Sequence, residues 1–320
     1  MKNDVNPGSM VVEDNKIRWD EESAQVRAAW YIPPKPPAPI GWLVFSEEFV
    51  LRVLQGRYTQ QLPARRTLPW RAVGFIVRAA LAVAQFALMF FSVVPLISGG
   101  MEMLAAHFRR GGFGFFLRSC YWKTKLDSLG QDTLIDRGID IWGARNIRIG
   151  SCCHLDTQLR LAAGEGRYGQ GGYLSVGDYS HIGPRCHIAA RGGVTIGDFV
   201  SIEAGVYVYS ATNTLIHPEH PGQLVSFSHT APPGFQSTIE APVYIGDYAM
   251  VGFGSLVMPG AAIGLGAIVH PHTRVIGQYP PFANITGPGR SRQNGWRRPP
   301  KRDPRVRIEG TPTEVESKGT

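Results

Sequence analysis

Aliphatic side chains recur at every sixth position through the second half of this 320-residue chain. A period of six fits neither an α-helix nor an isolated strand, but it suits a solenoid whose flat sides each point one aliphatic inward. The pattern therefore predicts three-sided coils of parallel strands. The clearest run is Ile245, Val251, Val257, Ile263, Val269 and Val275. The small corner residues that follow the first five are Ala249, Ser255, Ala261, Ala267 and Thr273.

The same spacing extends upstream and is interrupted twice. Ile149 and Leu155 indicate an early, less regular coil. Residues 161–172 and 210–242 break the period, so we expect them to leave the solenoid as loops. We thus predict a β-helix over 129–289 with one long loop at 210–242, stabilised by contacts between neighbouring coils. The upstream members of the series are Val176, Ile182, Ile188, Ile196, Ile202 and Val208.

The long interruption argues against a plain structural solenoid, although a repeat by itself defines architecture and not chemistry. On residues 194–206, 210–213, 245–264 and 280–290 the chain resembles the hexapeptide-repeat acyltransferases, in particular the sugar O-acetyltransferases. This resemblance implies an all-β solenoid, a left-handed parallel β-helix that assembles as a homotrimer. It also implies acetyl-coenzyme A as co-substrate, bound between adjacent subunits, and no metal.

In that family a histidine on the long loop removes the proton from the attacking hydroxyl. Imidazole suits this task because its pKa lies near neutral. The family's usual histidine after Asn213 is here Thr214. The resemblance therefore points to Asn213 at the start of the loop and to His217 or His220 as the general base, with His217 preferred. His229 is a weaker candidate from the same loop.

The resemblance also assigns residues to the coenzyme, whose pantetheine arm meets backbone amides and small side chains in this family. Arginines near the nucleotide end can pair with phosphates through forked, charge-assisted hydrogen bonds. It is equally reasonable to interpret these arginines as solvent-exposed charges that bind no ligand. The assigned residues are Gly252, Gly254 and Ser255 along one coil, followed by Gly287, Arg290 and Arg292.

Three further histidines share one register, because each stands directly before an inward aliphatic and should point outward. They are His154, His181 and His187. A six-residue step moves a side chain to the next side of the triangle, so His181 and His187 should not ligate one ion within a subunit. They could lie at the interface between subunits, or one of them could act as the general base in the active site of a neighbouring subunit. A carbonic-anhydrase-like site across subunits is the least favoured alternative, since zinc needs a third nitrogen ligand and a supporting shell.

The chain ahead of the solenoid differs in kind. Residues 1–40 are polar and end in a proline-rich run, which predicts a flexible segment. Within a helical region at 41–128, residues 79–97 run without a charge and are long enough to enter a bilayer. Basic residues flank both ends of this apolar run, unlike a single span with one cytoplasmic end. We therefore expect a hairpin or in-plane helix, broken near Pro95 and Gly99–Gly100.

Residues 101–122 place aromatic side chains among arginines, which is also typical of a membrane interface. The alternative is a buried helical cap that packs on the first coil. The formal net charge of +8 comes partly from a basic tail at 290–320, which we expect to be disordered. Such charge attracts anionic lipid, and no nucleic-acid-binding motif accompanies it. The four cysteines show no secreted-scaffold spacing.

The sequence therefore predicts a trimeric acyltransferase at the cytoplasmic face of a membrane. We expect it to transfer an acetyl group from acetyl-coenzyme A to a hydroxyl of a cell-surface polysaccharide or of a lipid-linked glycan precursor. N-acetylation of an amino sugar is the nearest alternative, because the same coil serves both reactions. A non-catalytic scaffold is the second alternative.

Overall fold

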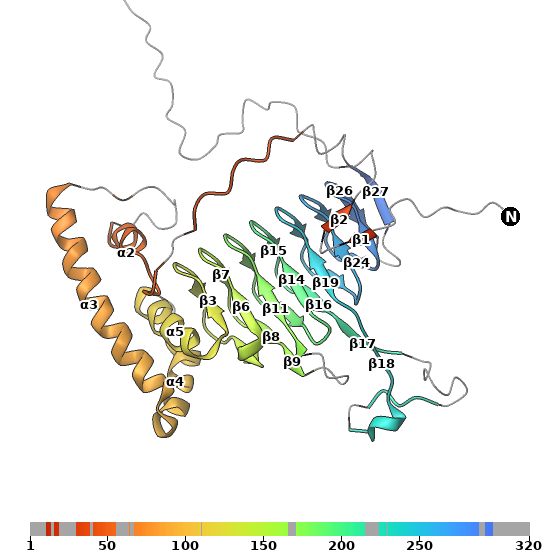
Figure 1. Ribbon diagram of the computed structural model, residues 1–320, viewed down its shortest axis with the longest axis horizontal. Coiled ribbons are helices and arrows are strands. Elements are labelled where there is room, and N and C mark those ends of the chain that lie inside the picture. The colour runs from red at the N-terminus through yellow and green to blue at the C-terminus, as the bar shows by residue number, and fades with distance from the viewer. Residues whose placement is uncertain are drawn as a thin grey trace, which may run out of the picture.

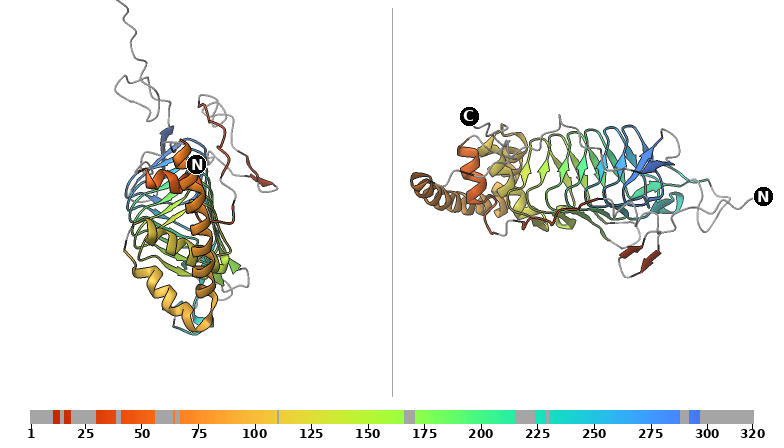
Figure 2. Two further views of the ribbon diagram at one scale, coloured as in Figure 1. Left: turned by 90° about the vertical axis from the view of Figure 1, so that its left-hand side faces the viewer. Right: turned by 90° about the horizontal axis from the view of Figure 1, so that it is seen from above.

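The computed structural model describes residues 11–13, 16–18, 30–38, 41–55, 64, 67–109, 111–165, 171–214, 224–228, 230–287 and 292–296. Its body is a three-sided parallel β-helix with helices at one end (Figure 1). Seen from above in Figure 2, the coils stack in a single row that begins at these helices.

Each side of the β-helix is one sheet of hydrogen-bonded neighbours. The first sheet comprises β3 (Ser128–Leu129), β6 (Ile147–Ile149), β11 (Leu174–Val176), β14 (Val194–Ile196), β19 (Val243–Ile245), β22 (Ala262–Ile263) and β25 (Gln278–Tyr279). The second sheet comprises β4 (Leu134–Ile135), β7 (His154–Leu155), β12 (His181–Ile182), β15 (Ser201–Ile202), β20 (Met250–Val251), β23 (Ile268–Val269), β26 (Ala283–Thr286) and β27 (Arg292–Trp296). The third sheet comprises β5 (Asp140–Trp142), β8 (Arg160–Ala162), β13 (His187–Ala189), β16 (Tyr207–Tyr209), β21 (Leu256–Val257) and β24 (Arg274–Val275).

Short elements decorate this body. Antiparallel hairpins pair β1 (Val11–Glu13) with β2 (Lys16–Arg18), β9 (Gly164–Glu165) with β10 (Gly171–Gly172), and β17 (Ala211–Asn213) with β18 (Thr238–Glu240). Single turns of 3-10 helix occur at η2 (Ala144–Asn146) and η3 (Pro233–Phe235).

The aliphatic series lies along the interior, as predicted. Val251, Val257 and Ile263 are completely buried, and each belongs to a different sheet. The corner residues are buried as well. They are small because a larger side chain there would collide with the adjoining coil. The prediction of a three-sided parallel solenoid is confirmed.

Two predicted boundaries of the solenoid are wrong. Leu161 belongs to β8, completely buried between Ile141 and Ile188 of the neighbouring coils, and the excursion begins only after it. The six-residue spacing did not reveal this because the chain leaves the solenoid directly after β8, so no aliphatic residue follows Leu161 at the expected position. The tail predicted as disordered contributes β27, which pairs antiparallel with β26 and covers the edge of the second sheet at the last coil.

A repeated Gly-Asp-aromatic triplet builds the corner between the first and second sheets. Tyr179, Phe199 and Tyr248 adopt φ of 59°, 56° and 59°, and their rings stack at 4.9 and 4.7 Å. The Asp178 backbone N–H donates to Oδ1 of Asp198 at 2.7 Å, and the next coil repeats this bond. Ring stacking and carboxylate acceptors together hold an unfavourable backbone conformation.

Residues 30–38, here termed the strap, run along this same corner. Lys35 Nζ lies 2.6 Å from Oδ2 of Asp178 and 2.7 Å from Oδ2 of Asp198. Burial by itself would lower the pKa of Lys35, but its bonds to the two carboxylates outweigh this effect and raise the pKa. The strap is therefore fixed to two successive coils by a charged lysine.

The strap also reaches the last coil. Trp30 stacks on Phe282, with ring centroids 5.4 Å apart. Figure 1 shows the strap running from the helical end of the body toward β26. The predicted flexible segment 1–40 thus contains a docked strap and the β1–β2 hairpin, because the carboxylates that bind the strap become neighbours only when coils stack.

Helices precede the β-helix. They are α2 (Glu47–Leu54), α3 (Leu68–Val93), α4 (Pro95–His107) and α5 (Gly112–Lys125). The break predicted near Pro95 falls at Val94, whose extended backbone precedes the proline. The break predicted at Gly99–Gly100 is wrong, since both glycines continue α4.

Helix α5 covers the first coil. Leu117, Tyr121 and Trp122 are buried in the same core as the β-helix aliphatics. The buried Arg118 guanidinium donates through Nε to the Ile135 carbonyl at 2.6 Å. The interfacial location predicted for 101–122 is therefore wrong for most of α5, and the alternative of a buried cap is correct there. Phe113, at the start of α5, remains 59% exposed.

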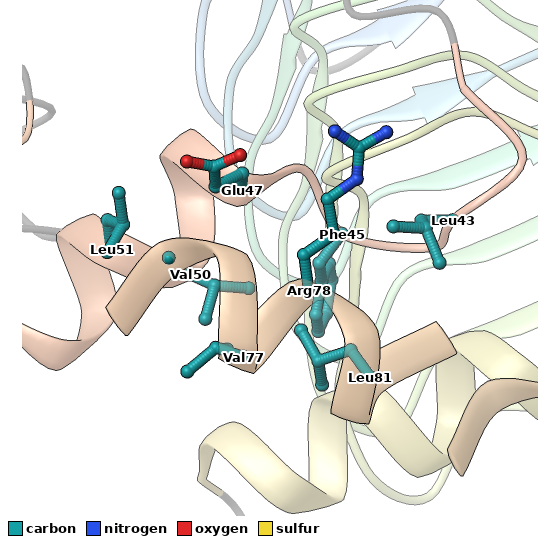
Figure 3. Close-up of a pocket in the computed structure, with 9 residues that line it drawn as sticks. Leu43, Phe45, Glu47, Val50, Leu51, Val77, Arg78 and Leu81 are labelled. Carbon is teal, nitrogen blue, oxygen red and sulfur yellow. The ribbon is translucent and has the colours of Figure 1, made fainter. Parts of the chain in front are cut away.

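Helix α3 is held on one side and open on the other. Figure 3 shows α2 beside α3, with Val50 next to Val77, and Leu51 and Leu81 line the same apolar pocket between the two helices. The amide of Gln85, the polar residue within the apolar run, bonds to the backbone of residues 42 and 44 and is buried. The opposite side of α3 exposes large apolar side chains. They are Val73, Phe75, Ile76, Val83, Phe86, Phe90, Phe91 and Val93.

Truncation of an inward aliphatic should destabilise the β-helix. For Ile202→Ala, in a middle coil and completely buried, we expect a loss of about 2–5 kcal/mol in the free energy of unfolding, because the rigid neighbouring coils cannot close the cavity. Urea unfolding followed by circular dichroism measures this loss. Ile239→Ala, on an exposed strand, is the matched control and should change stability by less than about 0.5 kcal/mol. Equal losses in both variants would contradict the assignment of the core.

Candidate active site

The long excursion leaves the β-helix at the corner between the third and first sheets, between β16 and β19. Ser210, at its root, is completely buried. Its hydroxyl donates to the Ala189 carbonyl at 3.0 Å and accepts from the Gly192 N–H at 2.8 Å. These bonds tie the departing chain to the preceding coil, so the excursion begins from a rigid point.

The first part of the excursion is an antiparallel arm formed by β17 and β18. Its pairing places Ala211 opposite Glu240 and Asn213 opposite Thr238. At the base of the arm, Nε of Arg191 lies 2.7 Å from Oε1 of Glu240. The arm is therefore anchored to the preceding corner by an ion pair as well as by Ser210.

A histidine and two tyrosines lie on the outer face of the third sheet beside the root of the arm. His187 pairs in register with Tyr207, and Tyr209 follows at the next outward position. The Tyr209 hydroxyl lies 3.2 Å from Nδ1 of His187, and the His187 ring meets both tyrosine rings edge-on. The side chain of His187 is thus fixed in orientation next to the excursion.

The surroundings of His187 favour its neutral form. Burial lowers the pKa of this imidazole below its usual range, and the Arg160 guanidinium lowers it further, while Asp140 acts in the opposite direction. A neutral imidazole at neutral pH can accept a proton. The corner therefore combines the fixed root of the excursion with a preoriented proton acceptor.

The histidines predicted as the general base lie outside the described residues. These are His217, His220 and the weaker candidate His229. Asn213, predicted with them, ends β17 and is exposed, and its amide donates to the Phe227 carbonyl at 3.3 Å. This bond joins the end of β17 to the segment 224–228, and the role of Asn213 in catalysis remains a prediction.

The residues predicted to bind coenzyme gather at another corner, between the second and third sheets. Gly252 and Gly254 lie there, and the Gly287 carbonyl accepts from the Arg274 N–H at 3.3 Å on the same edge. Ser255 is completely buried, and its hydroxyl bonds to the His270 carbonyl and the Thr273 N–H. Only the backbone of Ser255 can therefore line a surface site.

Of the two arginines predicted to bind the nucleotide end of the coenzyme, the structure describes only Arg292. Arg292 belongs to β27, where it pairs with Thr286, and Arg290 lies outside the described residues. Within one subunit the predicted coenzyme corner and the arm thus occupy different corners of the triangle. The structure brings Gly252, Gly254 and Gly287 to one corner, away from Asn213.

The outward histidines divide between two sheets, as the six-residue step predicts. His154 and His181 stack on adjacent coils of the second sheet at 5.2 Å, whereas His187 lies on the third. Possible ligand atoms of Asp136, His154 and Asp156 lie within 4.8 Å of one another. Nε2 of His181 lies 3.9 Å from Oδ2 of Asp156, so a second imidazole borders this cluster.

Sequence reasoning missed the pair formed by His187 and Tyr209. The two residues are 22 positions apart, and the irregular step after Ala189 hides their common register. The detectable signal is the Tyr207-Val208-Tyr209 alternation directly before the excursion, which places two aromatic rings on the outer face.

Comparison with known proteins gives this fold a family. A family model described as "Hexapeptide repeat of succinyl-transferase" matches residues 173–210. The chain is 30% identical over 148 residues to the dTDP-4-amino-4,6-dideoxy-D-glucose acyltransferase of Escherichia coli, covering 44% of this chain and 71% of that protein. It is 32% identical over 114 residues to Nodulation protein L of Rhizobium meliloti (strain 1021), covering 36% of this chain and 55% of that protein.

Solved structures with a similar fold include the N-acyltransferase AntD from Bacillus cereus in complex with dTDP and 3-hydroxybutyryl-CoA. That likeness has a TM-score of 0.48 and 22% identity, covering 55% of this chain and 86% of AntD. A hexapeptide-repeat acetyltransferase from Vibrio cholerae, complexed with acetyl coenzyme A, has a TM-score of 0.41 and 16% identity, covering 65% and 92%. By its relationship to the Escherichia coli enzyme and by its repeat, the chain belongs to the hexapeptide-repeat acyltransferases.

The electrostatic effect of Arg160 on His187 can be measured directly. We expect Arg160→Gln to raise the pKa of His187, because removal of a nearby positive charge favours the imidazolium. The pKa should stay below the ordinary value of 6.5, since burial is the larger cause. An NMR titration of the imidazole measures it, with Arg274→Gln on the same sheet as control. An unchanged pKa in Arg160→Gln would contradict this description of the site.

Proposed function

We propose that this protein transfers an acetyl group from acetyl-coenzyme A to a hydroxyl of a cell-surface polysaccharide or of a lipid-linked glycan precursor. The observation that carries the proposal is the interrupted β-helix of a hexapeptide-repeat acyltransferase, with its arm anchored beside a neutral histidine. Membership of this family of acyltransferases supports a coenzyme A thioester as the acyl donor.

The proposed reaction needs a proton acceptor and little else from side chains. The acceptor oxygen attacks the thioester carbonyl while its proton passes to an imidazole, for which His217 and then His220 are our candidates. Backbone N–H groups at a coil edge can stabilise the resulting oxyanion. Collapse of this intermediate breaks the C–S bond, and the coenzyme leaves as a thiol after taking up the proton. No step requires a metal.

The positions of the predicted residues support a homotrimer. Coenzyme residues such as Gly252 and the arm residue Asn213 lie on different corners of one subunit, so the arm of a neighbouring subunit would complete the site. A closed ring of three copies gives each coenzyme corner one arm. In such a ring the three β-helices run parallel, and all helical caps lie at the same end.

N-acylation of an amino sugar is the second candidate function. It is favoured by one observation, the 30% identity to the Escherichia coli acyltransferase whose name specifies a dTDP-linked 4-amino sugar. An amine acceptor would use the same cleft and thioester and would also give up a proton during attack. The two candidates differ in the acceptor atom alone, so a direct comparison of acceptors separates them.

We further propose that the protein lies at the cytoplasmic face of a membrane with α3 in the plane of the interface. Residues Ala72–Val93 of α3 have a mean hydropathy of 2.0, and 11% of the most apolar stretch is buried. The buried Gln85 faces the protein, and the outer side of α3 carries the apolar residues. Figure 1 shows α3 crossing the end of the β-helix, so an in-plane α3 would hold the β-helix upright on the membrane.

The enzymatic proposal predicts thiol release from acetyl-coenzyme A that depends on a sugar acceptor. We expect activity in the fraction whose mass by light scattering is that of a trimer of the 35.1 kDa chain. His217→Ala should lower kcat/KM by about 10²–10⁴-fold, because general-base catalysis contributes about that much. Parallel reactions with hydroxyl and amino sugars distinguish O- from N-acylation.

His220→Ala and His187→Ala complete this experiment. Full activity in both loop variants together with loss in His187→Ala would move the base from the loop to the third sheet. Full activity in all three variants would remove histidine base catalysis from the mechanism. Absence of coenzyme binding by calorimetry would favour the scaffold alternative.

The membrane proposal predicts flotation with anionic lipid vesicles in a density gradient. Phe86→Glu combined with Phe90→Glu should abolish flotation, because two charges would enter the apolar face of α3. Phe227→Glu combined with Phe235→Glu, two similarly exposed aromatics on the excursion, is the matched control and should float like the unmodified protein. Flotation of the α3 double variant would mean that α3 is not the contact.

A further inference from the structure

An open cleft of about 500 Å³ lies on the outer face of the first sheet, on the coils nearest the helical cap. Its floor is a ladder of outward side chains in register, from Arg148 through Ser175 to Thr195. Asp127, two residues after the end of α5, lines the end nearest the cap. Strands about 4.8 Å apart give this ladder a length of about 10 Å.

The charged end of the cleft is cationic. Arg148 forms an ion pair with Asp127, and Arg145 projects from η2 into the same cleft beside Asn146. Among the residues that the structure describes, no carboxylate lies within ion-pairing distance of Arg145. Two guanidinium groups against one carboxylate leave a net charge of about +1, with forked donors that match phosphate oxygens.

The other end of the cleft is neutral and reaches the root of the arm. Tyr173 lies over Gly193, where a Cβ would come within 2.9 Å of the ring and where φ is +93°. The Thr195 hydroxyl donates to the Tyr173 hydroxyl at 3.4 Å. The Gly193 carbonyl also accepts from the Val243 N–H where the chain returns from the excursion. The half-exposed ring of Tyr173 and the two hydroxyls suit a sugar or a nucleobase. They lie beside the proposed site of acyl transfer.

We propose that this cleft binds the diphosphate of the acceptor, with phosphate oxygens on Arg145 and Arg148 and the attached sugar directed along the ladder toward the arm. The proposal rests on the proposed function, whose acceptor is a lipid-linked glycan precursor or, in the second candidate, a nucleotide-linked amino sugar. The same chemistry occurs in a nucleoside diphosphate sugar and in a prenyl diphosphate-linked sugar. The cationic end adjoins the cap, which the membrane proposal places at the lipid, so either source can reach it.

Calorimetry tests this binding without requiring turnover, using UDP-N-acetylglucosamine and geranyl diphosphate as probes. We expect Arg145→Gln and Arg148→Gln each to raise Kd by about tenfold or more, as for loss of one charge-assisted hydrogen bond. Asp127→Asn should lower Kd, because it removes the opposing carboxylate. The control Arg185→Gln, an exposed arginine at another corner, should leave Kd unchanged.

Binding of the nucleotide probe alone, or of the prenyl probe alone, supports the cleft and identifies the source of the diphosphate. Binding of neither probe, or an equal loss in the Arg185→Gln control, overturns the proposal. The two proposals fail separately. Transfer to a sugar with an unchanged acceptor KM in Arg145→Gln and Arg148→Gln would reject the cleft and keep the enzyme. Arginine-dependent binding without any transfer would keep the cleft and reject the acetyltransferase.

Discussion

The structure depends on the direction of its backbone hydrogen bonds. Each coil points its N–H and C=O groups along the axis, so only another coil can satisfy them. The interior aliphatics follow from this constraint, because stacked coils leave room for one inward side chain per side. The two ends follow as well. Helix α5 covers the first coil, and β27 pairs with β26, so that the edge of the second sheet is occupied at the last coil.

The same constraint decides where chemistry can reside. Strand positions are committed to the hydrogen-bonded ladder, so corners are the places where the chain can leave without breaking it. The excursion departs from one corner, where the buried Ser210 fixes it. His187 lies on the third sheet beside this root, and Tyr173 lies over Gly193 on the side of the first sheet. The corner thus brings together a fixed departure point, a proton acceptor and the neutral end of the cleft, although each belongs to a different strand.

The periodic part of the fold could be predicted from the sequence because its signal is local. Every member of the series from Ile245 to Val275 occupies an inward position, and no distant residue is needed to explain it. The register between coils depends instead on the length of each excursion, which the six-residue period does not determine. His187 therefore meets Tyr209 only after an irregular corner is counted correctly. Composition misled at the N-terminus for a related reason, since the proline-rich run resembles a linker until stacking assembles the partners of Lys35.

The strap has a consequence for how the molecule comes apart. A stack of repeats ordinarily frays from its ends, one unit at a time, because each unit contacts only its neighbours. Here a single segment holds Phe282 at the far end through Trp30 and reaches back through Pro37, whose carbonyl accepts from the Tyr179 hydroxyl. Contacts spread along the axis in this way couple distant coils and bind the last coil to the middle of the stack. The coils should therefore unfold together rather than one after another from the ends.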